Sequence, residues 1–326
     1  GTLGVTGVLT ATSLDISGDI DVDGTTNLDI VDIDGAVDMA STLQVDGAIT
    51  GSSTIVGSTI NGVGISSNIA NFSQSILISQ DAGTGTLDSA SFNTGFGYNV
   101  FDVLTTGDRN SSFGRVALSA LTTGESNTAM GNAALGSNTT ASNNTAIGAS
   151  ALNANTTGTS NTSVGYQALR DNTTASNNTA VGLNSLALNT TGASNTASGV
   201  SSLLVNTTGG GNVAIGVNAL VANTTADNNT AVGVSSLAAN TTGHQSVAIG
   251  SGALAANTTA HSNTAVGYNT LNDNTTGTLN TAIGTFTLDV NTTGDNNTGL
   301  GYGALSANTT ADNNTAVGHL ALLANT

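Results

Sequence analysis

Apolar and polar residues follow one long, fixed period through most of the chain. From residue 92 onward, a glycine returns every 17 residues with no insertion or deletion. The residue before this glycine is apolar in thirteen of the fourteen repeats, and Leu stands four residues after it in thirteen. An unbroken period of this length indicates a repeat architecture, in which every residue of the unit has a structural place.

Two sets of residues define the repeat. The repeat glycines are Gly97, Gly114, Gly131, Gly148, Gly165, Gly182, Gly199, Gly216, Gly233, Gly250, Gly267, Gly284, Gly301 and Gly318. The repeat leucines, which we expect in the core, are Leu118, Leu135, Leu152, Leu169, Leu186, Leu203, Leu220, Leu237, Leu254, Leu271, Leu288, Leu305 and Leu322.

Each repeat contains two short segments that we expect to be extended. The first reads Asn-Thr-Ala-Val and ends at the repeat glycine, and the second reads Leu-x-x-Asn-Thr-Thr. The Gly and Asn residues between them suit the positive-φ positions of tight turns. Two such breaks within 17 residues leave no room for three helical turns.

Seventeen residues cannot bury a core alone, but repeats stacked in register can. The Val/Ile position before the glycine and the repeat leucine would form two continuous apolar columns, while Asn and Thr would form hydrogen-bonded columns along the axis. The pattern therefore predicts an all-β protein with a parallel β-solenoid, or β-roll, over residues 92–326, incomplete at its C-terminal end. Fourteen coils spaced by ~4.8 Å would make a rod about 67 Å long.

The first part of the chain has a different pattern. Residues 1–66 alternate apolar residues with Asp or Thr and lack the 17-residue unit. One such chain has a thin apolar stripe and many unpaired edges, so it needs copies of itself for stability. We therefore expect residues 1–66 to be a fibrous trimeric β stalk, residues 67–91 a junction, and the protein a homotrimer. The chain starts at Gly1 and stops within a repeat at Thr326, so we also expect it to be a piece of a longer polypeptide.

Composition and charge narrow the range of functions. The 326 residues include 42 Gly but no Pro, Cys or Trp, and 20 acidic residues are opposed by only three arginines, which gives a net charge of −17. Phosphate-binding loops and Schiff-base chemistry need lysine, which is absent, and nucleic-acid binding needs a basic surface. A thiolate zinc site needs cysteine. No run of 18 apolar residues is present to insert into a membrane. We expect no enzymatic activity, no cofactor and no nucleic-acid partner.

The repeat also resembles known fibrous proteins. Residues 245–254, Gln-Ser-Val-Ala-Ile-Gly-Ser-Gly-Ala-Leu, look like the head repeat of trimeric autotransporter adhesins. Residues 161–169, followed by Asn-Thr-Thr at 172–174, are closer to repeats of bacteriophage tail fibres, and residues 42–50 are similar to phage fibre shafts. The adhesin resemblance implies a left-handed parallel β-roll built as a trimer. Most coils have Thr where the adhesin head has a residue like Val247, which would change the lateral packing.

The acidic first segment contains a weak candidate for a calcium site. Asp19, Asp21 and Asp23 match the first half of a calcium-binding loop, but Ile30 stands where the closing glutamate is needed. Strand alternation with Asp facing water is the alternative interpretation.

A second metal candidate lies in the turns of the repeats. His244 and His261 occupy the same turn position in successive coils, one coil after Asp227, so stacking at ~4.8 Å would let them share a metal ion. The residue type varies freely at this position elsewhere, as expected for an exposed turn tip, which is the alternative.

Asparagine at fixed positions creates formal glycosylation sequons. Asn-Thr-Thr occurs eleven times, from Asn138 to Asn308, and Asn143, Asn177 and Asn228 begin Asn-Asn-Thr sequons. Because a stacked ladder also needs Asn at one position, the regular occurrence has a structural explanation.

Tyrosines mark a further position. Tyr98, Tyr166, Tyr268 and Tyr302 all directly follow a repeat glycine, at a position of variable type. We expect an outward column there, which either binds carbohydrate or, as we favour, covers the edge between coils.

These features together favour a structural fibre protein. We expect an extracellular segment of a phage tail fibre, part of the virion, that projects a tip for adhesion and host attachment to a cell-surface receptor such as a glycan. The alternative is a trimeric autotransporter-like adhesin or filament of the bacterial cell surface. A third hypothesis is ice binding by Thr columns, but this normally uses outward Thr-x-Thr ranks, whereas adjacent Thr-Thr side chains face opposite sides of a strand.

Overall fold

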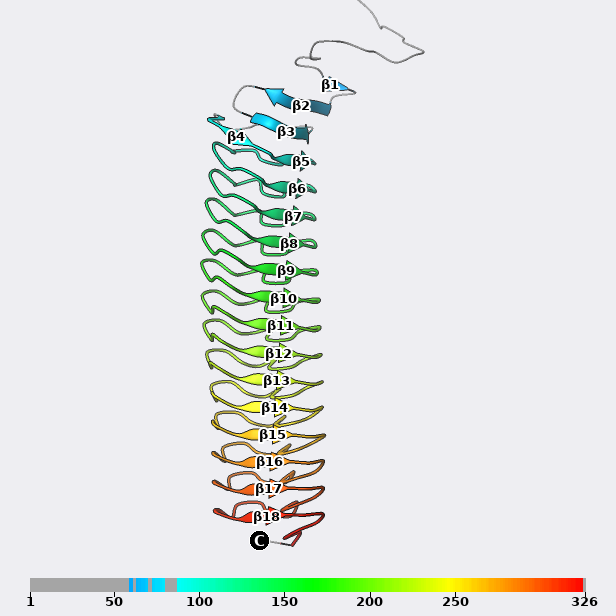
Figure 1. Cartoon of the computed structure of the whole chain (residues 1–326), viewed down its shortest axis with the longest axis vertical. Coiled ribbons are helices and arrows are strands. Elements are labelled where there is room, and N and C mark those ends of the chain that lie inside the picture. The colour runs from blue at the N-terminus through cyan, green and yellow to red at the C-terminus, as the bar shows by residue number, and fades with distance from the viewer. Residues whose placement is uncertain (1–58, 61–62, 70–71, 80–86, 325–326) are drawn as a thin grey trace, which may run out of the picture. The chain divides into compact units, whose positions relative to one another are not determined.

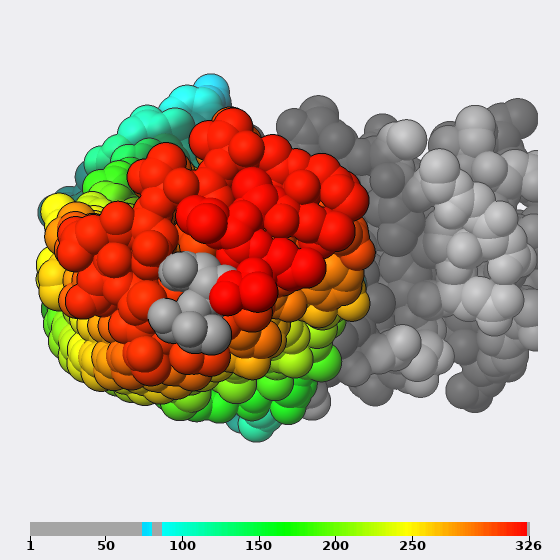
Figure 2. Space-filling view, turned by 90° about the horizontal axis from the view of Figure 1, so that it is seen from below, coloured from blue at the N-terminus to red at the C-terminus, as the bar shows by residue number. Residues whose placement is uncertain are grey.

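The chain winds into a stack of coils from residue 87 onward. The computed structural model describes residues 59–60, 63–69, 72–79 and 87–324 (Figure 1). Most of the predicted stalk lies outside the described residues, and so do the calcium candidates Asp19, Asp21 and Asp23. Within the described ranges there is no helix. Seen along the axis from the C-terminal end, the coils lie one behind another in chain order (Figure 2).

Each coil contributes one three-residue strand to a single parallel sheet. Neighbouring strands pair in parallel, and each residue lies beside the equivalent residue of the next repeat, as Thr128 does beside Thr145 and Ala129 beside Ala146. This confirms the predicted parallel β-solenoid with 17-residue coils. The strands are β5 (Thr94–Phe96), β6 (Ser111–Phe113), β7 (Thr128–Met130), β8 (Thr145–Ile147), β9 (Thr162–Val164), β10 (Thr179–Val181), β11 (Thr196–Ser198), β12 (Val213–Ile215), β13 (Thr230–Val232), β14 (Val247–Ile249), β15 (Thr264–Val266), β16 (Thr281–Ile283), β17 (Thr298–Leu300) and β18 (Thr315–Val317).

A β-hairpin covers the N-terminal edge of this sheet. Strands β2 (Val63–Ile69) and β3 (Phe72–Ser79) pair antiparallel, and β1 (Thr59–Ile60) pairs antiparallel with β2. On its other side, β3 pairs in parallel with β5 and with the short β4 (Ala90–Ser91). The first coil is therefore hydrogen-bonded on both sides. Strands β3 and β4, which lie in the predicted junction over residues 67–91, therefore belong to the same sheet as the coils.

The core is narrower than the sequence pattern suggests. The repeat leucines are buried as expected from Leu118 to Leu305, but Leu322 is half exposed because no described coil follows it. The Val/Ile position forms the predicted column, but the expectation that this column helps to bury the core is wrong, since Ile215 and Ile283 are 42% and 40% exposed. In a three-residue strand the two ends face one side and the middle residue the other. The middle residue, usually Ala as at Ala214, faces the core and is fully buried.

The second predicted extended segment forms turns instead of a strand. From the repeat glycine to the Asn-Thr-Thr sequence, the backbone is a series of turns and bends. The repeat leucines adopt the left-handed conformation, with φ of 49° at Leu118 and 53° at Leu186, and so does the residue two places before them. Bonds between coils hold these turns, because Leu118 N–H donates to the carbonyl of Ala134 one coil later, at 3.2 Å.

Two buried asparagine ladders run along the axis and confirm the predicted polar columns. In the sequon ladder, the Asn of each Asn-Thr-Thr after the first donates from Nδ2 to Oδ1 of the equivalent Asn one coil earlier, as Asn172 does to Asn155 at 2.9 Å. In the strand ladder, Oδ1 of the Asn that precedes a strand accepts the backbone N–H of the equivalent residue one coil later, as Asn144 does from Asn161 at 3.0 Å. Ser246 takes the place of Asn before β14, and its Oγ accepts the N–H of Asn263 at 3.2 Å. Threonine columns bond differently, since the Oγ1 of Thr156 donates to the backbone carbonyl of Thr173.

Candidate functional site

The outer face of the sheet carries a continuous apolar surface. We call it the exposed stripe, and it combines the residue before and the residue after each repeat glycine. The half-exposed large apolar members are Phe96, Tyr98, Phe113, Met130, Ile147, Tyr166, Val181, Leu183, Val200, Ile215, Val217, Val234, Ile249, Tyr268, Ile283, Leu300, Tyr302 and Val317. The stripe therefore follows the described coils from β5 to β18.

Side chains along the exposed stripe contact one another from coil to coil. Phe96 and Phe113 stack with ring centroids 4.8 Å apart, which is the spacing of the coils. The row before the glycines contains no charged residue, and the row after them contains one arginine, Arg115, whose guanidinium lies over the ring of Tyr98 at 5.7 Å. An uncharged apolar surface that extends along a rod is typical of a protein–protein contact.

The tyrosines predicted to point outward are exposed. Near the C-terminal coils, Tyr268 packs edge to face on Phe286 at 5.5 Å, and Phe286 on Tyr302 at 6.1 Å. His319 stacks on Tyr302 at 5.4 Å. Because these rings pack on each other along the axis, their arrangement favours covering the edge between coils over stacking on a sugar.

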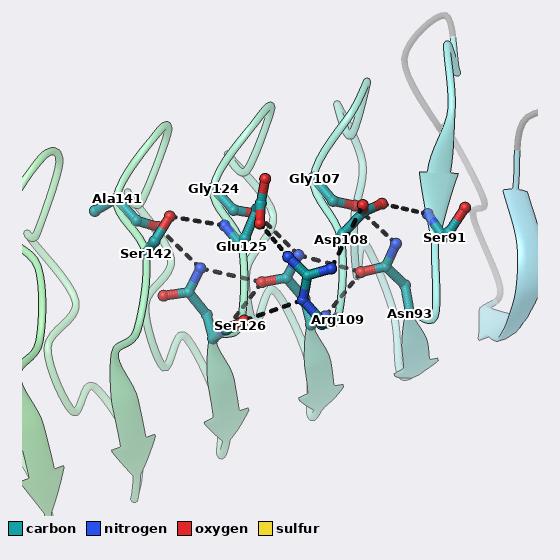
Figure 3. Close-up of polar contacts among 12 residues, drawn as sticks. Ser91, Asn93, Gly107, Asp108, Arg109, Gly124, Glu125, Ser126, Ala141 and Ser142 are labelled. Atoms are coloured by element: carbon teal, nitrogen blue, oxygen red, sulfur yellow. Dashed lines mark hydrogen bonds and ion pairs between the residues drawn. The ribbon is translucent and has the colours of Figure 1, made fainter.

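The turn position that sequence analysis took as freely varied has a structural role. We call it the turn row: Asp108, Glu125, Ser142, Thr159, Ser176, Ala193, Gly210, Asp227, His244, His261, Thr278, Asp295 and Asp312. Six of its acidic and hydroxyl side chains accept a backbone N–H of the preceding coil. Oδ1 of Asp108 accepts the backbone N–H of Ser91 at 2.7 Å, and Oγ of Ser142 accepts that of Glu125 at 2.9 Å (Figure 3). Asp and Ser at this row therefore cap the turn of the coil before.

Most basic groups of the described coils are paired locally. Arg109 makes ion pairs with Glu125 and, at 3.9 Å, with Asp108 of its own turn (Figure 3). Arg170 binds Asp171 through two hydrogen bonds of 2.7 Å, and these raise the pKa of the arginine above its ordinary value. Neither arginine offers an anion-binding surface.

The histidines proposed as metal ligands are neighbours, but their geometry does not suit one shared ion. The rings of His244 and His261 stack with centroids 5.0 Å apart and planes 9° from parallel. Parallel rings at this distance do not direct nitrogen lone pairs at a common point. Among the described residues, no group of three His, Cys, Asp or Glu side chains is placed to hold a metal ion. The Oδ1 atom of Asp227 instead accepts the backbone N–H of Gly210 at 2.6 Å.

Burial separates the glycosylation sequons into two classes. The asparagines of all eleven Asn-Thr-Thr sequences are completely buried in the sequon ladder. Asn143, Asn177 and Asn228, in the Asn-Asn-Thr sequons, are exposed turn residues with φ of 60° to 62°. Only the second class presents an amide to solvent in the folded coil.

One carboxyl group lies in an unfavourable environment. Burial raises the pKa of Asp289 above its ordinary value, and the negative charge of Asp273 adds to this effect. Its Oδ1 atom is buried without a hydrogen-bond partner. The residue follows the repeat leucine Leu288 directly, and Asp273 lies in the preceding coil.

Neither a family model, nor a curated protein, nor a solved structure matches this chain. The described residues also contain no helix with the length and apolar character needed to cross a bilayer. Function must therefore be inferred from the surfaces that the coils expose.

Sequence reasoning missed the exposed stripe because it assigned the Val/Ile position to the core. The signal was present in the strand itself, since Thr-Ala-Val places a small residue between two larger ones. A core that accepts only a small residue, Ala, Ser or Gly, at the middle of the strand leaves the larger residues outside.

Proposed function

We propose that this chain is a structural segment of an extracellular fibre, of the phage tail-fibre type, in which three copies associate side by side. The rod would act as a spacer that projects a receptor-binding tip toward a host surface. The exposed stripe is the observation that supports this proposal.

The size of the stripe supports a partner of similar length. Two rows of side chains along fourteen coils make a strip ~67 Å long and ~10 Å wide, on the order of 650 Å². The largest apolar patch of a soluble monomer is about 300–600 Å², and a stable interface buries about 800 Å² on each partner. The strip is therefore large for a surface left in water.

A second copy of the same chain is the partner that fits best. The stripe has the 17-residue repeat along its whole length, so another straight stack with the same coil spacing can match it coil by coil. Copies related by an axis parallel to the rod place identical residues at the same height. The net charge of −17 makes contact through charged faces unfavourable, whereas the stripe is almost uncharged.

Light scattering after size exclusion tests the association directly. The expected mass is three times the 31.7 kDa of one chain. A variant carrying Ile215→Asp, Ile249→Asp and Ile283→Asp should elute as a single chain, because three buried charges would face one another in every copy. These positions are exposed in the single rod, so circular dichroism should stay unchanged.

A matched control places the same charges elsewhere. Thr208→Asp, Thr276→Asp and Thr293→Asp lie at exposed positions outside the stripe and should keep the wild-type mass. A wild-type protein of one-chain mass at micromolar concentration would overturn the proposal. So would a stripe variant that still associates.

Immunogold labelling with an antibody to residues 92–326 addresses the biological setting. Gold along filaments attached to virus tails is expected. Gold on filaments rooted in a bacterial envelope would instead identify a cell-surface adhesin or filament and contradict the tail-fibre proposal.

A further inference from the structure

A polar notch interrupts the turn row between β12 and β14. It has a volume of about 310 Å³ and lies between the turns of two successive coils. Its lining residues are Thr225, Ala226, Asp227, Asn228, Thr242, His244 and Gln245. The volume is at the lower end of the range of small-molecule sites, ~300–1,000 Å³.

Contacts with the neighbouring coils fix the two ends of the notch. His244 is stacked against His261 of the next coil, which holds its ring as a flat wall. Asp227 is held by the N–H of Gly210 through Oδ1, which leaves its second oxygen available. The two turns are joined by a backbone hydrogen bond of 3.2 Å from Gln245 N–H to Asp227 C=O. The Asp227 carboxylate and the His244 ring are therefore positioned before any ligand arrives.

The preceding coil makes room for this arrangement. Its turn is Gly209-Gly210-Gly211, a sequence that no other repeat contains. A Cβ atom on Gly211, which has φ of 68°, would come within 2.6 Å of Oδ1 of Asn228. The absence of side chains there allows the amide of Asn228 to lie beside the turn.

The chemistry of the lining points to a neutral, hydroxyl-rich ligand. Asn228 and Gln245 each offer amide donors and an acceptor, the threonine hydroxyls do both, and Asp227 accepts. The notch contains no Lys or Arg side chain to hold an anion. The parallel imidazoles of His244 and its neighbour His261 do not converge on a metal ion. The face of His244 offers an apolar wall for the C–H face of a ring.

We propose that the notch binds one residue of a neutral polysaccharide. The sugar hydroxyls would pair with Asp227, Asn228 and Gln245, and the ring would pack on His244. This site is independent of copy–copy association, because the turn row and the exposed stripe are different positions of the coil.

Saturation-transfer NMR and titration calorimetry with the full chain test the site. The probes are a panel of neutral mono- and disaccharides, with an acidic sugar and Zn²⁺ as separate titrations. We expect saturable binding of at least one neutral sugar. Asp227→Asn should weaken it about tenfold or more, because Asn retains an oxygen for the Gly210 N–H but loses the carboxylate acceptor. His244→Ala should weaken it similarly.

Asp312→Asn is the matched control. Asp312 occupies the turn row five repeats later and caps the N–H of Asp295 at 2.7 Å, so its substitution should leave sugar binding unchanged. The proposal is overturned if no neutral sugar binds at ~10 mM, a concentration far above the Kd of ordinary binding sites. It is also overturned if Zn²⁺ or the acidic sugar binds in preference, or if the Asp227 and His244 variants bind as well as wild type.

Discussion

The buried leucines adopt a backbone conformation that leucine rarely takes. The left-handed region costs an L-residue roughly 1–2 kcal/mol, and every repeat leucine from Leu118 to Leu305 lies there. Burial of a Leu side chain contributes about 1.5–3 kcal/mol, which offsets that cost. Gly would be less strained at these positions, but Leu is retained because its side chain fills the core.

The repeat glycines are required for a different reason, and we predict that Gly182→Ala is strongly destabilising. Gly182 has φ of 133°, and a Cβ there would approach the carbonyl oxygen of Gly199 to 2.6 Å. Strain of this kind costs about 1–3 kcal/mol before the clash is counted. Thermal unfolding should show a Tm several degrees lower.

Gly136 provides the comparison for this substitution. A Cβ at Gly136 would meet the side-chain amide of Asn153 at 2.9 Å, and the φ of Gly136 is not in the left-handed region. That amide donates to the carbonyl of Ala133 at 2.8 Å, so Gly136→Ala should cost at most about 1 kcal/mol, the worth of one hydrogen bond. Equal effects of both substitutions would contradict the requirement for a positive φ at the repeat glycine.

Asp289 should make the rod less stable at neutral pH than at acidic pH. Because burial raises its pKa in the folded state, the folded chain holds the proton more tightly than the unfolded chain. Stability contributed by this group therefore falls as pH rises from the ordinary carboxyl pKa through the raised one. Asp289→Asn should raise the Tm at pH 7, and the gain should shrink below about pH 4. A gain that is the same at both pH values would exclude titration of Asp289 as the cause.

At the scale of the element, one coil is the unit of stability. Each coil bonds to its two neighbours through the strand, the turns and both asparagine ladders. Stability of such stacks is close to a sum of coil and nearest-neighbour terms. One coil should therefore be removable if its neighbours can meet in register.

Deletion of residues 182–198 tests this expectation. The deletion joins Val181 to Gly199 and keeps every row continuous. The shortened protein should retain its circular dichroism per residue, with a Tm within a few degrees of wild type. Deletion of residues 183–198 leaves one residue too many in a coil and should lower the Tm clearly. Equal tolerance of both deletions would argue against strict register.

Much of the coil could be predicted from the sequence, and the part that could not has a definite cause. Period, parallel stacking, leucine core and asparagine columns follow from spacing alone. The direction of the Val/Ile side chains does not follow from spacing. Alternation in a strand of three residues places the middle side chain opposite the two end side chains, but it does not say which of the two faces is buried. The left-handed turns at the leucines were also not predictable, since leucine ordinarily disfavours them. The polar notch depends on which turn residues meet across coils, and only the closeness of the histidines to Asp227 was predicted.

At the scale of the whole molecule, charge opposes association and the exposed stripe favours it. Copies that each carry −17 repel one another, and salt screens that repulsion over about 10 Å at 0.1 M. Association should therefore strengthen between about 20 mM and 500 mM NaCl, measured by sedimentation at several chain concentrations. Weaker association at high salt would mean that ion pairs, and not the stripe, hold the copies together.

The burial of eleven sequon asparagines has a consequence for where the protein can be made. Some secretory pathways attach oligosaccharide to a nascent chain before it folds, and the acceptor is the same Asn-x-Thr sequence. In this chain each Asn-Thr-Thr asparagine must later enter a ladder with no accessible surface. A bulky sugar there would prevent the coil from closing. Production in such a host should therefore yield unfolded chain, and a host without that machinery should yield the rod.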